Sequence, residues 1–97
     1  MTVLLSFNGF KSGTAGTAVI TVNEPGHGRS TGDTVRFRDV EDFDGFTSSV
    51  VENSSGYSIT KVTDDTFTFT VSGETATVGD VNGGGGFASA GPVTVSA

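Results

Sequence analysis

Short runs in which apolar and polar residues alternate dominate this chain. The clearest is Thr66–Ser72, in which Phe67, Phe69 and Val71 share one face and threonines occupy the other. A period of two is typical of a β-strand with one buried face. The same pattern predicts strands over Thr17–Asn23, Thr34–Val40 and Tyr57–Val62.

Weaker apolar patterns predict shorter strands at Val3–Phe7, Phe46–Val51 and Glu74–Val81. Three residues separate Tyr57–Val62 from Thr66–Ser72, and this gap predicts a hairpin. In no segment do the apolar residues repeat with the period of a helix, so no helix is predicted. We therefore expect an all-β fold, a small antiparallel barrel or sandwich of about 6–8 short strands with extended terminal arms.

The chain has 97 residues, which suits a single domain. We expect residues 1–16 to form an N-terminal arm or edge strand and residues 17–81 to form the β core. Four consecutive glycines follow Asn82. Residues 82–97 are therefore predicted to be a glycine-rich linker followed by a C-terminal arm or strand.

Composition narrows the range of partners. Only 16% of residues are charged, the net charge is −6, and 15 Thr and 11 Ser supply most of the polarity. An acidic surface repels phosphates, so neither nucleic acid nor an anionic membrane is an expected partner. There is no cysteine, and the first residues lack the basic and apolar regions of a signal peptide. We expect a soluble protein made in the cytoplasm.

The candidate catalytic groups do not form a recognisable set. His27 is the only histidine and lies between two glycines, without a nucleophile or orienting carboxylate in a known pattern. We expect it to pack or hydrogen-bond locally. The sequence therefore predicts no catalytic residue, no enzyme activity and no cofactor.

A cluster of acidic residues occupies the predicted loop that ends at Gly45. Asp39, Glu41, Asp42 and Asp44 could supply oxygen ligands to a hard cation. The spacing is not that of an EF-hand loop. We expect a solvated loop, with a salt contact to a basic partner surface as the alternative. No metal site is predicted, although the sequence alone leaves cation binding there open.

Phe43 and Phe46 flank Gly45 beside this polar loop. Aromatic side chains at a loop tip form a binding surface when they are exposed. They form part of the core when they fold back over its end, and the sequence leaves both arrangements open.

Residues 27–69 carry an ordered set of motifs. They are His27-Gly28, Gly32-Asp33 followed by Val35 and Phe37, Phe43-Asp44-Gly45, Tyr57-Ser58-Ile59-Thr60-Lys61-Val62, and Asp65-Thr66-Phe67-Thr68-Phe69. This set resembles a small β-module of tailed-phage virion proteins.

The resemblance implies a bacteriophage virion structural protein, assembled in the host bacterial cytoplasm and located in the virion. A capsid decoration (cement) protein that bridges major capsid protein subunits is the role we expect, and a trimer is the expected oligomer. The alternatives are a tail, baseplate or fibre-associated component and a stand-alone carbohydrate-binding domain, although the chain has no Trp. The expected partner contacts are Val3, Leu4, Leu5, Phe7, Phe43, Phe46, Phe87 and Val93.

Overall fold

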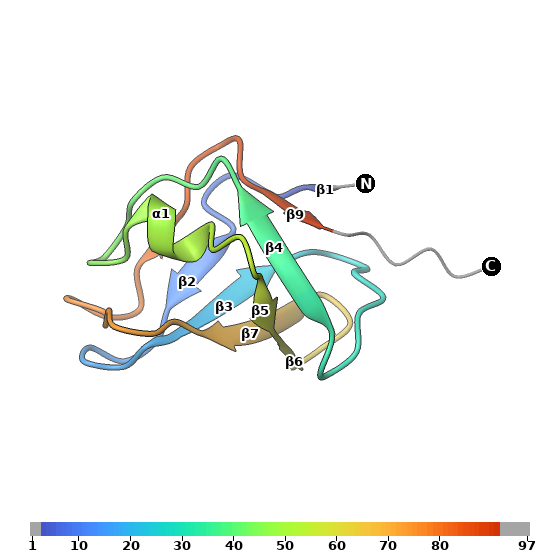
Figure 1. Ribbon diagram of the computed structural model, residues 1–97, viewed down its shortest axis with the longest axis horizontal. Coiled ribbons are helices and arrows are strands. Elements are labelled where there is room, and N and C mark those ends of the chain that lie inside the picture. Colours follow the sequence, from blue (N-terminus) through green and yellow to red (C-terminus); the bar gives the residue numbers. More distant parts are fainter. Residues whose placement is uncertain (1–2, 92–97) are drawn as a thin grey trace.

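The computed structural model describes residues 3–91, which form two packed antiparallel sheets (Figure 1). One sheet has four strands in the order β1-β9-β4-β5, and the other has five in the order β6-β7-β3-β2-β8. The all-β prediction is confirmed, as a two-sheet sandwich and not a closed barrel. The elements are β1 (Val3–Leu4), β2 (Phe10–Ser12), β3 (Val19–Asn23), β4 (Thr34–Arg38), α1 (Ser48–Val51), β5 (Tyr57–Ser58), β6 (Thr60–Lys61), β7 (Thr66–Thr70), β8 (Asn82–Gly83) and β9 (Ser89–Gly91).

The five-stranded sheet is built around the β3–β7 pair, in which alternation decides which side chains are buried. Ile20 lies opposite Phe69, and Val22 lies opposite Phe67. All four side chains are buried, while Thr21 and Thr68 form the neighbouring pair on the outer face. Successive side chains point to opposite faces of a strand, so this register places these four large apolar side chains in the core, while Val19 at the start of β3 is exposed.

The four-stranded sheet covers this core with β4. Val35 and Phe37 are fully buried, whereas the intervening residues of β4 are exposed. The ring of Phe37 stacks on Phe67 at a centroid distance of 6.3 Å and contacts Phe69 at 4.8 Å. Figure 1 shows that β4 crosses β3 and β7, and these ring contacts hold the two sheets together at the crossing.

The segment predicted as one strand, Tyr57–Val62, is divided between the two sheets at Ile59. The part before it pairs with β4, and the part after it pairs with β7. Ile59 is buried, and its backbone exchanges hydrogen bonds with the turn that precedes β4: its N–H donates to Asp33 O and its C=O accepts from Gly32 N. The predicted hairpin is therefore confirmed for Thr60–Lys61 and wrong for Tyr57–Ser58.

Two other secondary-structure predictions are wrong. The predicted strand Phe46–Val51 contains helix α1, whose start is fixed by acidic side chains from elsewhere: Ser48 N donates to Asp42 Oδ1 at 2.6 Å and Thr47 N donates to Glu74 Oε1 at 2.8 Å. The predicted strand Glu74–Val81 is a loop, because its backbone bonds to side chains and to turns instead of to a neighbouring strand.

The glycine run was predicted to be a linker, and within residues 83–85 that prediction is wrong. Gly83, Gly84 and Gly85 are buried. A Cβ built on Gly84 would lie 2.2 Å from a Phe10 ring carbon, and one built on Gly83 would lie 2.3 Å from Phe43 Cβ. The backbone is packed against aromatic side chains so closely that only glycine fits.

The N-terminal segment contributes to both sheets. β1 is an edge strand, as predicted, but β2 lies between β3 and β8, and Phe10 is fully buried. Residues 10–12 therefore belong to the core and not to an arm. At the other end, β9 lies between β1 and β4. Residues 1–2 and 92–97, which include Val93, lie outside the described part of the chain.

Candidate functional site

The structure separates the predicted partner contacts into two groups. Leu5, Phe43 and Phe46 are buried in the core, so the prediction that they contact a partner is wrong for the folded chain. Val3 is partly buried and packs against the same core. Three of the predicted contacts are exposed to solvent: Leu4 (68% exposed), Phe7 (75%) and Phe87 (77%).

These three side chains, which we call the apolar surface, belong to two segments that run side by side. Leu4 pairs with Ser89 in the β1–β9 ladder. The pairing continues beyond the strands, because Leu5 N donates to Ala88 O at 2.8 Å and Asn8 N donates to Gly85 O at 3.0 Å. Residues 3–8 and 85–90 therefore form one antiparallel ribbon that carries all three exposed side chains.

The backbone of this ribbon is fixed by a left-handed residue. Asn8 has φ +50, which asparagine tolerates better than most residues, and its Oδ1 accepts from Gly85 N at 3.0 Å. The Phe7 ring lies over Gly86, with its Cδ2 3.3 Å from the position that a Cβ would occupy. Phe7 is thus held beside the residue that precedes Phe87.

Large exposed apolar side chains are otherwise scattered in the described part of the chain. Val19 lies on β3, Val62 follows β6, and Val78 lies in the loop before β8. Isolated exposed apolar residues are ordinary on soluble proteins, whereas three large exposed apolar side chains on one short ribbon mark a candidate interaction site. The apolar surface is therefore the strongest candidate for a partner contact.

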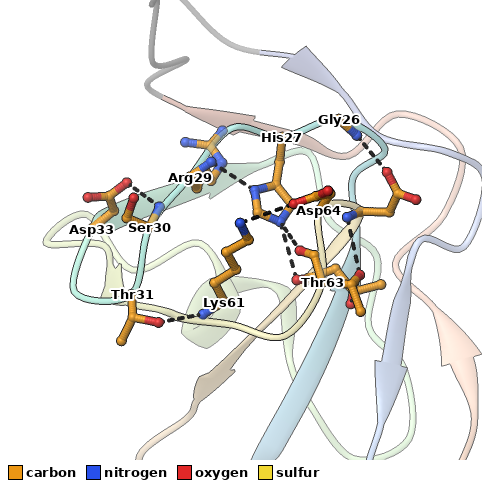
Figure 2. Close-up of polar contacts among 11 residues, drawn as sticks. Gly26, His27, Arg29, Ser30, Thr31, Asp33, Lys61, Thr63 and Asp64 are labelled. Atoms are coloured by element: carbon orange, nitrogen blue, oxygen red, sulfur yellow. Dashed lines mark hydrogen bonds and ion pairs between the residues drawn. The ribbon is translucent and has the colours of Figure 1, made fainter.

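His27 is a buried structural residue, as the sequence predicted (Figure 2). Its Nε2 donates to Thr63 O at 2.8 Å and lies 3.2 Å from Thr66 O, and its Nδ1 accepts from Arg29 N at 2.8 Å. This arrangement requires the neutral tautomer with the proton on Nε2. Because backbone groups occupy both nitrogens, His27 has no free position for acid–base chemistry in this conformation.

A buried ion pair supports the same loop, and the sequence analysis did not identify it. Arg29 Nε lies 2.8 Å from Glu24 Oε1, and Nη2 lies 3.3 Å from Oε2. The guanidinium also lies over the Phe67 ring at 5.8 Å. Charged residues five apart in a loop carry no pattern that distinguishes a buried pair from two solvated side chains.

The motif set that carries the resemblance has a structural explanation. Gly26 N donates to Asp65 Oδ1 at 2.9 Å, and His27 binds the same turn, so the loop before β4 is fastened to the β6–β7 turn (Figure 2). Ser30 N donates to Asp33 Oδ2 and shapes the turn that enters β4. The His-Gly, Gly-Asp and Asp-Thr-Phe motifs thus hold one corner of the sandwich together.

The acidic loop also has a structural role. Asp44 Oδ2 accepts from Ser12 Oγ at 2.6 Å and from Gly79 N, and its Oδ1 accepts from Val78 N at 2.7 Å. The bond from Ser12, followed by those from the backbone, lowers the pKa of Asp44. Within residues 3–91 no three His, Asp or Glu side chains gather in a way that could hold a metal ion.

Comparison with known proteins does not assign a family: no protein-family model matches the chain, and no curated protein matches it significantly. The described residues also contain no helix that is long and apolar enough to cross a membrane. The resemblance to the phage module stays a hypothesis, and the apolar surface is the feature on which a function can be argued.

Proposed function

We propose that this chain is a bacteriophage virion structural protein, a capsid decoration protein that docks on major capsid protein subunits through the apolar surface. The observation that carries the proposal is the exposure of Leu4, Phe7 and Phe87 on one hydrogen-bonded ribbon. Exposed aromatic side chains on a rigid backbone lose little conformational entropy on binding. Such a surface suits attachment to a protein lattice.

The edge of the four-stranded sheet gives this surface a second means of contact. β1 is an edge strand, and Leu5 N bonds to Ala88 O, the residue just before β9. In an antiparallel ladder the N–H and C=O groups of the adjacent residue, Leu4, then point away from β9. A capsid segment can pair with these groups while its side chains cover Leu4, and the chain would thereby bridge neighbouring capsid subunits.

A tail-tip role would favour exposed aromatic side chains such as Phe43 and Phe46, and both are buried. The carbohydrate-binding alternative is left with Phe7 and Phe87 as aromatic platforms. Both alternatives predict a different result in a particle-binding experiment, since only a decoration protein, here proposed to be a trimer, binds the capsid shell in a fixed ratio.

Co-sedimentation of the purified chain with shells of the parent phage that lack it tests the proposal. We expect saturable binding at a fixed ratio to capsid subunits. Absence of binding to shells, with binding to intact tails or to polysaccharide instead, would refute the decoration role.

A further inference from the structure

The outer face of the four-stranded sheet carries a pair of arginines next to the apolar surface. Arg36 and Arg38 are exposed and alternate along β4 with the buried Val35 and Phe37. Residues two apart on a strand lie about 7 Å from each other on the same face. The two guanidinium groups therefore form a short row that follows β4.

The strand register places Leu4 on this same face. Arg38 pairs with Ser89, and Ser89 pairs with Leu4 on its other side, so these three residues form one row across the sheet. The next row joins Arg36 to Gly91. Phe87, which belongs to the apolar surface, lies two residues before Ser89. Along the face it therefore comes next after the row of Arg38, just before β9 begins. None of the described residues that form these rows is acidic, and a carboxylate just beyond them is that of Glu52, which accepts from Asp39 N at 3.2 Å.

The charge of this face contrasts with the rest of the protein. The chain has a net charge of −6, with 11 acidic residues and five Lys or Arg. Of those five, Arg29 is buried against Glu24 and Lys61 lies 3.1 Å from Asp64. Among residues 3–91, Arg36 and Arg38 have neither an ion pair nor another polar side-chain contact. Two cations without an ion-pair partner among the described residues are thus presented beside exposed apolar side chains.

We propose that this face binds an acidic, extended segment of the partner protein with the pattern Glu-x-Glu-x-apolar. Side chains two apart on an extended segment repeat at about 7 Å, which matches the separation of Arg36 from Arg38. The apolar side chain of the pattern, four residues after the first Glu, then lies level with Phe87. The inference rests on the proposed docking function and adds the chemistry of the segment that docks.

A short acidic segment fits this face better than a long polyanion does. A nucleic acid would extend past the two arginines onto a surface whose net charge is negative. A segment with two carboxylates meets both guanidinium groups and ends on apolar side chains. Because the arginines are exposed, the attraction is screened by salt, and binding should weaken as ionic strength rises.

Titration of the 15N-labelled chain with a peptide probe tests the inference. The probe is the capped pentapeptide Glu-Thr-Glu-Thr-Phe, and the control peptide has Lys in place of Glu. We expect the acidic peptide to bind roughly tenfold more tightly, as two exposed ion pairs would give. The amide signals that shift should be those of residues 4, 36–38 and 87–91.

Two variants with the same net charge test whether the preference for the acidic peptide depends on Arg36 and Arg38 or only on the net charge of the protein. R36S/R38S removes two positive charges from this face, and K11E makes the same change in charge on the outer face of the other sheet. R36S/R38S should abolish the preference for the acidic peptide, and K11E should leave it unchanged. Equal binding of both peptides, no binding at millimolar concentration, or an unaltered preference in R36S/R38S would overturn the inference.

The same variants distinguish this inference from the proposed function. If shells bind the wild type and R36S/R38S equally well, the docking function stands and the acidic segment is refuted. If shells bind neither, the docking function fails, and the peptide titration still decides the chemistry of the face. A dimer of the free chain that R36S/R38S abolishes would assign the face to a second copy and overturn the inference.

Discussion

Replacement of His27 tests whether the corner formed by the loop before β4 and the β6–β7 turn stabilises the fold. In His27→Ala the buried N–H of Arg29 loses its acceptor at 2.8 Å, which costs about 1–3 kcal/mol. The hydrogen bond from Nε2 to Thr63 O contributes roughly 1 kcal/mol more. The edge contact with Phe67, at 5.4 Å, adds about 1 kcal/mol.

These contributions predict that His27→Ala lowers the free energy of unfolding by about 3–5 kcal/mol, a large part of the ~5–15 kcal/mol of a typical domain. Two matched variants divide the effect. The amide oxygen of His27→Asn can replace Nδ1 as the acceptor for Arg29 N, whereas the amide N–H of His27→Gln can replace Nε2 as the donor to Thr63 O.

Urea unfolding followed by far-UV circular dichroism measures all three variants. His27→Asn should recover the larger share of the loss, because an unsatisfied buried donor is the most costly single defect. A loss below about 1 kcal/mol for His27→Ala, which is the scale of an ordinary surface substitution, would refute the reasoning. Equal losses in all three variants would show that the hydrogen bonds are not what His27 contributes.

Three further substitutions test other contacts. Arg29→Met leaves the buried carboxylate of Glu24 without its partner and should destabilise the fold by about 3–5 kcal/mol in urea unfolding, and a loss under about 1 kcal/mol would contradict the ion pair. Gly84→Ala combines φ +99 with a Cβ that meets a buried ring at 2.2 Å, so thermal unfolding should show a loss of about 2–4 kcal/mol, and an unchanged midpoint would refute the close packing. The pKa of Asp44 is lowered mainly by the hydroxyl of Ser12, so its contribution is present above about pH 4 and is lost as the pH falls through the folded-state pKa. Stability measured against pH should fall less steeply below about pH 4 in Asp44→Asn than in the wild type, and equal slopes would contradict this role.

Strands β4 and β7 could be predicted from the sequence because in each of them apolar and polar residues alternate strictly. In β7 and β4 every second residue is Phe or Val and is buried, so local pattern and tertiary packing agree. The role of His27 as a local packing residue was also predictable, since no catalytic partner accompanies it.

Other features depend on contacts between residues that are far apart in sequence. The glycine run has the composition of a linker, yet Phe10 and Phe43 pack directly on it. Helix α1 depends on Asp42 and Glu74, which bind the backbone at its start. Such contacts are set by tertiary structure, which a single sequence does not display.

The exposed side chains were only partly predictable. Leu4 and Leu5 are neighbours of the same type, and the strand alternation that exposes one and buries the other depends on where β1 pairs. Phe43 and Phe46 flank a polar loop, but their backbones pair with each other and both rings turn inward. Which side chains form the apolar surface therefore could not be predicted without the three-dimensional structure.

The central claim is that the ribbon of residues 3–8 and 85–90 is the part of this protein that docks on a particle. Hydrogen–deuterium exchange on the free chain and on the chain bound to capsid shells tests it most directly. The account predicts slower exchange on binding in peptides that cover this ribbon and β4, with unchanged exchange in β3 and β7. Protection of the outer face of β3 and β7, with unchanged exchange in the ribbon, would contradict it.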